Sequence, residues 1–291
     1  MPKIRTIALL AALLTSISSA AQEIAFTSLS LTADGSGRQD VVAFVALEAL
    51  PAGTSINFTD RGWNGTAFFN ATARESVVTY TASAEIPAGT MIRLGSHSNT
   101  GNSFSEFGSL NGPWLDLSED GDQVLAFTGT PENPRFLAAV TTFVDPNDFD
   151  PTTGWNTGTV QSDHASALPE GLAPGRNALA LTRIGEAPFA YNQYIGPTTG
   201  TEQWLLDSIG DRDNWYRGDA PSPTSLPAAF TIEQPVRALS ATVDLHPAIN
   251  VQMELSDNGG VPLPNGTYEV EFRIWNTETS DSAAQELVWG A

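Results

Sequence analysis

The chain of 291 residues has no cysteine, three histidines and a single lysine, Lys3. Without cysteine it forms neither a disulfide framework nor a catalytic thiolate, and it lacks the residue to which lipoprotein anchors are attached. After its first 21 residues no stretch is apolar enough to cross a bilayer, so the sequence predicts no membrane span. An apolar content of 41% with seven tryptophans indicates that a buried core stabilises the fold.

The residue patterns of common catalytic sites are also missing. The chain has no Gly-x-Ser-x-Gly, no His-Glu-x-x-His, no Ser-x-x-Lys and neither of the glycine-rich phosphate-binding patterns. A two-carboxylate glycosidase stays open, because the separation of two carboxyl groups is invisible in a sequence. The sequence therefore favours a protein that is not an enzyme.

The three histidines are the alternative to that view. His97, His164 and His246 could together hold zinc or copper in an extracytoplasmic metalloenzyme, hydrolytic or redox. The sequence favours the alternative that they are three unrelated loop residues. Their convergence on a common point would decide between the two.

The N-terminus has the layout of a secretory signal peptide. Lys3 and Arg5 precede an apolar run over residues 7–14, and small residues follow up to Ala21. The run is well short of the roughly 20 apolar residues of a membrane anchor. We expect cleavage after Ala20 or Ala21, which makes residues 1–21 the signal peptide. The protein is then secreted or held at the cell surface or envelope.

Acidic residues far outnumber basic ones, and the net charge is −20. Cleavage removes Lys3 and Arg5 but no acidic residue, which leaves 11 basic and 33 acidic residues and a charge of −22. Such a surface repels nucleic acid and attracts divalent cations and basic partners. Because the acidic residues are scattered, solubility or salt tolerance explains the charge equally well. We expect no nucleic-acid partner.

Alternation of polar and apolar residues indicates a mainly β fold. Turn signals rich in glycine and proline separate the alternating runs about every 8 to 15 residues, the spacing of a β-sandwich. The expected strands of the main domain are 23–32, 41–50, 55–59, 76–81, 91–94, 123–128, 135–143 and 178–182.

One or two short helices are expected to cap the sandwich. Thr201 is the expected N-cap of a helix in which Trp204, Leu205 and Ile209 share a face before Gly210. A second short turn includes residues 213–215.

The expected organisation has three parts after the signal peptide. A β-sandwich domain spans 22–218, and a proline- and serine-rich linker or surface crossing spans 219–231. A small β-module spans 232–291, with alternating runs at 249–255 and 267–275.

Several segments of the main domain resemble bacterial secreted or surface proteins that carry an N-terminal β-rich domain of uncharacterised function. They follow in order as EIAF (23–26), DVVAFV (40–45), PAGTSINFTDRGW (51–63), GDQVLAFTG (121–129), SALPEGL (166–172), GTEQWLL (200–206) and DNW (213–215). The tail at 264–275, with 287–289, resembles the opening of short β-modules of bacterial surface and fibre-like proteins. The resemblance implies a surface or secreted accessory role without a reaction.

Two acidic loops are candidate calcium sites, because hard cations need several oxygen ligands on a tight loop. Residues 116–122 match the first half of an EF-hand-type loop and lack its final glutamate, and the alternative is a plain turn. Residues 145–150 place three carboxylates and an amide within one long loop, where water could also separate the charges. The candidate ligands are Asp116, Asp120, Asp122, Asp145, Asn147, Asp148 and Asp150.

Three tryptophans are candidates for stacking on a sugar ring: Trp63, Trp155 and Trp215. The alternative is that each closes one end of the core. With no catalytic pattern present, the sequence favours a binding protein whose partner is a cell-envelope protein or a glycan. Calcium bound to the acidic loops would stabilise its fold. A further alternative is a structural subunit of an envelope assembly, in which a partner strand completes the final β-module.

Overall fold

A computed structural model shows the fold of this protein. It describes residues 24–31, 38–69, 75–97, 102–158, 164–233, 242–245, 249–252, 273–275 and 287–290. The chain divides into two compact units, Met1–Glu233 and Gln234–Ala291. The predicted signal peptide lies outside the described residues.

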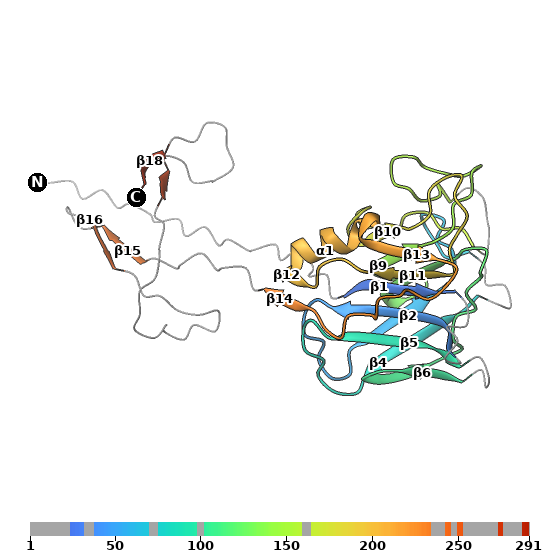
Figure 1. Cartoon of the computed structure of the whole chain (residues 1–291). Coiled ribbons are helices and arrows are strands. Elements are labelled where there is room, and N and C mark those ends of the chain that lie inside the picture. Colours follow the sequence, from blue (N-terminus) through green and yellow to red (C-terminus); the bar gives the residue numbers. More distant parts are fainter. Residues whose placement is uncertain are drawn as a thin grey trace, which may run out of the picture. The chain divides into compact units, whose positions relative to one another are not determined.

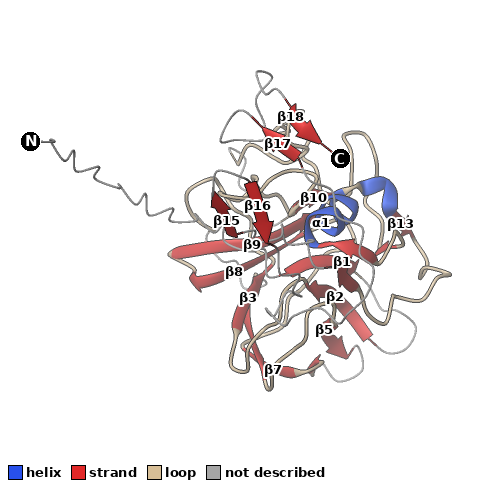
Figure 2. Cartoon of the chain, turned by 90° about the vertical axis from the view of Figure 1, so that its left-hand side faces the viewer, coloured by secondary structure: helices blue, strands red, loops and turns tan. Residues whose placement is uncertain are grey.

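The first unit is a sandwich of two six-stranded sheets, which confirms the predicted fold class (Figures 1 and 2). The first sheet has the order β13 (Trp215–Gly218), β11 (Tyr191–Tyr194), β1 (Ile24–Ser30), β2 (Arg38–Ala46), β5 (Met91–His97) and β6 (Ser103–Ser105). The second has the order β10 (Ala178–Ala180), β9 (Asn133–Thr141), β8 (Gln123–Thr130), β3 (Ser55–Thr59), β4 (Val77–Ala82) and β7 (Gly108–Asn111).

The core lies between the sheets, as the alternation predicted. In β4 every second residue is buried, and Phe44, Phe58 and Tyr80 form aromatic contacts between the two sheets. Within these two sheets neighbouring strands pair antiparallel, except β9 and β10, which pair parallel. The parallel pair needs a long connection, and this connection over residues 142–177 supplies the loops discussed below.

Helix α1 (Glu202–Gly210) closes the side of the sandwich between the two edge strands β10 and β13, beside which it lies in both views. The predicted N-cap is present, since the Thr201 hydroxyl accepts a hydrogen bond from the Trp204 backbone N–H at 3.3 Å. Leu205 and Ile209 are buried in the core, whereas Trp204 is 46% exposed. Trp204 therefore does not share the buried face as predicted. The short 3₁₀ helix η1 (Arg212–Asn214) follows.

The proline- and serine-rich segment packs on the first unit as a surface crossing. Its Thr224 carbonyl accepts a hydrogen bond from the Gln193 side chain at 2.8 Å, and Phe230 is buried. Beyond it, β14 (Thr231–Glu233) pairs parallel with β12 (Thr199–Thr201). All residues of β1 are buried. The crossing lies beside Ser28 and Ser30 of this strand, which α1 also contacts. The boundary between the units consequently follows Glu233.

The second unit contains two antiparallel strand pairs among its described residues. They are β15 (Thr242–Leu245) with β16 (Ile249–Gln252), and β17 (Arg273–Trp275) with β18 (Leu287–Gly290). Most of the run predicted at 267–275 lies outside the described residues. In the described part of the chain, no helix is both long and apolar enough to span a membrane.

Candidate functional site

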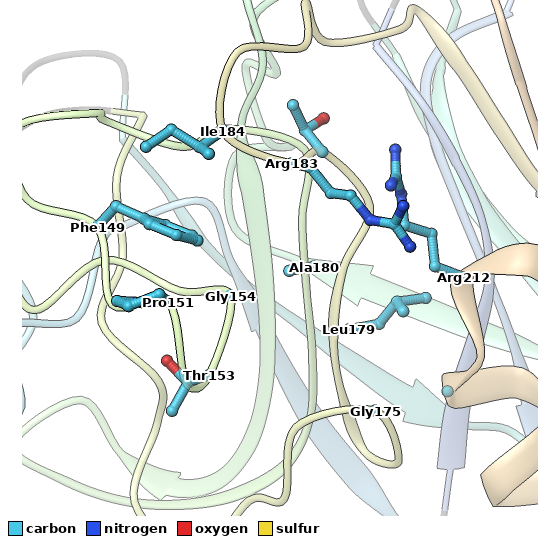
Figure 3. A pocket seen from close by; sticks show the side chains of 12 residues that line it. Phe149, Pro151, Thr153, Gly154, Gly175, Leu179, Ala180, Arg183, Ile184 and Arg212 are labelled. Atoms are coloured by element: carbon cyan, nitrogen blue, oxygen red, sulfur yellow. The ribbon is translucent and has the colours of Figure 1, made fainter.

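A pocket of about 420 Å³ opens beside β10 (Figure 3). Its walls come from the loop before β10, from β10 and the residues after it, and from the end of α1 with η1. Twelve residues line it: Phe149, Pro151, Thr153, Gly154, Gly175, Leu179, Ala180, Thr182, Arg183, Ile184, Gly210 and Arg212. Volumes of about 300–1,000 Å³ are typical of small-molecule sites.

One wall of the pocket is the loop over residues 148–158, which hydrogen bonds between its own residues hold in place. Asp148 is buried, and its carboxylate accepts hydrogen bonds from the Thr157 hydroxyl and from the Gly158 N–H. The Asp150 carboxylate accepts bonds from the Thr152 N–H at 2.8 Å and from the Thr153 hydroxyl at 3.0 Å. These bonds, led by the one from Thr152, lower the pKa of Asp150. Phe149 and Pro151 are thereby held in place.

The opposite wall is anchored by an ion-pair cluster. The Arg212 side chain is 8% exposed and bonds to Glu186, which also accepts from Arg217 at 3.4 Å. The Arg212 Nε donates to the Leu181 carbonyl at 2.5 Å. The hydrogen bond from Arg212 lowers the pKa of Glu186, so its carboxylate is charged at neutral pH. This cluster fixes the loop after β10 against η1.

Gly175 and Gly210 bring α1 against the loop before β10. A Cβ at Gly210 would stand 2.1 Å from the Gly175 carbonyl oxygen. Only glycine permits this approach, and both residues line the pocket.

The acidic loop at 145–150 is organised by local hydrogen bonds. Asp145 accepts from the backbone and side-chain amides of Asn147, at 2.8 and 3.1 Å. The oxygens of Asp148 and Asp150 are used as described above, so the carboxylates do not converge on one point. Among the described residues no group of three acidic or histidine side chains could hold a metal ion. Calcium binding by this loop stays a prediction that the geometry does not favour.

The second acidic loop is a plain turn that ends on a buried carboxylate. The Gly121 N–H bonds to the Ser118 carbonyl at 3.0 Å, and both Asp122 oxygens accept backbone N–H groups, from Ser118 and Gln123. Asp116 and Asp120 are exposed. Asp122 thus caps the turn rather than facing Asp116 and Asp120 as a ligand set.

Asp122 lies close to a second buried carboxylate, Asp60, at one end of the second sheet. Asp60 accepts from the backbone N–H groups of Ser76 and Asp116, at 2.6 and 2.9 Å. Its carbonyl oxygen accepts from the Gln123 side chain. Burial raises the pKa of Asp60 and, further, that of Asp122, to which the charges of Asp60 and Glu75 also contribute.

These raised pKa values predict the pH dependence of stability. A carboxyl with a raised pKa in the folded state stabilises the fold below its unfolded pKa, near 3.8, and this contribution is lost as the pH rises through the raised value. In Asp122→Asn we expect a flatter decline of the melting temperature with pH above about 4 than in the wild type. The control Asp120→Asn, at an exposed residue of the same turn, is expected to retain the wild-type slope. Equal slopes in all three proteins, measured by thermal unfolding, would contradict the expectation.

The segments that carry the family resemblance meet at this end of the sheet. The bond from Gln123 to Asp60 joins GDQVLAFTG to PAGTSINFTDRGW. The Trp63 N–H donates to the Ser166 hydroxyl at 3.1 Å, which joins the latter segment to SALPEGL. The segments that carry the predicted resemblance are thus joined to each other by hydrogen bonds.

All three candidate tryptophans lie inside the protein. Trp155 is fully buried, and Trp63 packs edge-on against Phe68 and Phe136 with ring centroids 5.2 and 5.0 Å apart. Trp215 donates its indole N–H to the Ile209 carbonyl at 2.7 Å. None presents a ring face to solvent, so closure of the core, the alternative named above, is what the structure shows.

The histidines are only partly described. His164 is half-buried, with its ring centroid 5.9 Å from that of Phe143. His97 ends β5, but its side chain, like the whole of His246, lies outside the described residues. Their convergence on a metal stays a prediction.

Sequence reasoning missed the residues that line the pocket. Phe149 and Arg183 stand in separate loops and Arg212 in η1, and no short motif joins them. The one available signal is the scarcity of basic residues in so acidic a chain. Because there are few arginines, Arg183, Arg212 and Arg217 could have been examined as candidates for a common site.

Comparisons of the chain with protein-family models, with curated proteins and with solved structures found no match. The resemblance to bacterial surface proteins stays a prediction from the sequence.

Proposed function

We propose that this protein is an exported binding protein, secreted or associated with the cell envelope, whose sandwich domain holds a small ligand in the pocket beside β10. The observation that carries the proposal is the pocket itself. It combines an apolar wall with a few fixed polar groups, which is the usual make-up of a ligand site. Export rests on the pattern of residues 1–21.

The rigidity of the walls supports the proposal. Bonds within the 148–158 loop and the cluster around Glu186 fix two walls of the pocket. Binding then costs little ordering entropy, because the site is already formed.

The wall residue Phe149 provides the test. Purified protein is screened by thermal unfolding against neutral sugars, uronic acids and small organic acids with their amides, since a ligand that binds only the folded state raises the melting temperature. For any compound that does so, we expect Phe149→Ala to weaken binding at least about tenfold, because it removes the aromatic part of the wall.

Phe107→Ala is the matched control. Phe107 is 55% exposed in the turn between β6 and β7 and does not line the pocket. Its replacement is expected to leave affinity unchanged. If no compound raises the melting temperature, or if both variants bind as the wild type does, the proposal is wrong.

A further inference from the structure

We propose that the pocket selects a small organic anion, namely a carboxylate on an apolar body. This inference rests on the proposed function and names the ligand class of the same site. It follows from the charges that line the pocket, from the hydrogen-bond donors left unused there and from the apolar wall that faces them.

The charge of the lining is opposite to that of the protein. Two of the twelve lining residues are arginines and none is acidic, in a chain with a net charge of −20. In Figure 3 the side chains of Arg183 and Arg212 lie on the same side of the pocket, across from Phe149, Pro151 and Ile184. Two guanidinium groups at one place attract an anion and repel a cation.

Arg183 is available to a ligand. Its side chain is 66% exposed, and its ion-pair partner is the 80% exposed Asp213 at 3.9 Å. Among the described residues the guanidinium makes no hydrogen bond. The backbone of Arg183 is bonded instead: its N–H donates to the Glu186 carboxylate at 3.0 Å, and its carbonyl accepts from the Glu186 N–H at 3.0 Å. The guanidinium fork can therefore turn to a carboxylate, which it recognises through two parallel hydrogen bonds.

Arg212 supplies a fixed second cation. Its Nε and Nη2 bond to the Leu181 carbonyl and to Glu186, which orients the guanidinium. Within the described part of the chain, Nη1 has no hydrogen-bond partner. A side chain that is 8% exposed and held in this way loses little freedom on binding.

The facing wall indicates the other half of the ligand. Phe149, Pro151 and Ile184 form it, and Ile184 is 50% exposed. Apart from the arginines, the hydrogen-bonding side chains of the lining are the hydroxyls of Thr153 and Thr182, and that of Thr153 already donates to Asp150. A sugar with many hydroxyls would leave most of them unpaired, whereas an aromatic or aliphatic acid would not.

The test compares acids with their neutral amides. Phenylacetate and hexanoate, each beside its amide, are titrated into the purified full chain by calorimetry. We expect the acids to bind at least about tenfold more tightly, because charge-assisted hydrogen bonds are stronger than neutral ones. Arg183→Gln is expected to reduce this preference to about twofold or less. Arg183 is exposed, so the variant should fold normally, and circular dichroism checks this.

Arg135→Gln is the matched control. It removes the same charge from an exposed residue on β9 that does not line the pocket, and it should keep the preference for acids. Equal affinity for acids and amides would overturn the inference and leave the proposed function intact. Binding of a neutral sugar alone, abolished by Phe149→Ala, would do the same. If none of the sugars, acids and amides binds, both this inference and the proposed function are overturned.

Discussion

Replacing Trp155 with alanine is expected to lower the free energy of unfolding by about 3–5 kcal/mol. The side chain is fully buried in a cluster with Trp63, Phe127 and Phe136, and its removal leaves a cavity that these rings cannot fill. Denaturant unfolding followed by circular dichroism measures the change.

The control for this substitution is Trp204→Ala. Trp204 is 46% exposed on α1, so its loss should cost about 1 kcal/mol or less. A Trp155 variant that unfolds like the wild type but loses ligand affinity would contradict the structural role and restore the sugar-stacking interpretation. Because Trp155 directly follows Gly154, which lines the pocket, a structural role also predicts weaker binding together with lower stability.

The second large effect is expected at Gly210, where alanine should destabilise the fold by about 2–4 kcal/mol. Replacing glycine with alanine in a helix usually stabilises the fold by up to about 1 kcal/mol. At Gly210 the contacts of the added Cβ reverse this effect. The added Cβ would lie 2.1 Å from the oxygen and 2.3 Å from the carbon of the Gly175 carbonyl. Both are backbone atoms that cannot rotate away, so α1 must shift from the loop before β10.

The outcome of Gly210→Ala is read in two ways. Thermal unfolding gives the loss of stability, and ligand titration gives the loss of affinity that follows when two lining residues, Gly175 and Gly210, move apart. Gly53→Ala is the control, because no atom lies within 4 Å of its added Cβ. The expected cost of about 1–2 kcal/mol comes only from the positive φ of Gly53, +83°, which alanine adopts with strain. A Gly210 variant more stable than the wild type would show that the helix end can rearrange freely.

Several elements of the fold could be predicted because their signals are local. Alternation over 55–59 matches β3 to the residue, and Thr201 caps α1 as expected. Strands of three or four residues, such as β6 and β12, carry too few alternations to be recognised. They exist because a neighbouring strand supplies the hydrogen bonds.

The candidate site shows the opposite case. Residue type made the tryptophans and carboxylates candidates, but type does not specify exposure. Trp155 is buried because the cluster around Phe136 surrounds it, and Asp122 is buried because backbone N–H groups satisfy both of its oxygens. The rings around Trp155 come from other parts of the chain. The N–H groups that bond to Asp122 belong to the flanking residues Ser118 and Gln123, but its buried neighbour Asp60 is distant in the sequence.

The sequence by itself determined the mainly β class, the acidic charge and the start of the helix. Alternation and capping depend on residues that are close together in the chain, and the charge depends only on the number of acidic and basic residues. The tertiary structure alone decided which carboxylates are buried and where the pocket lies. Asp60 meets Asp122 only because β3 and β8 are neighbours. Phe149 faces Arg212 only because β10 pairs parallel with β9 and α1 closes the edge beside it.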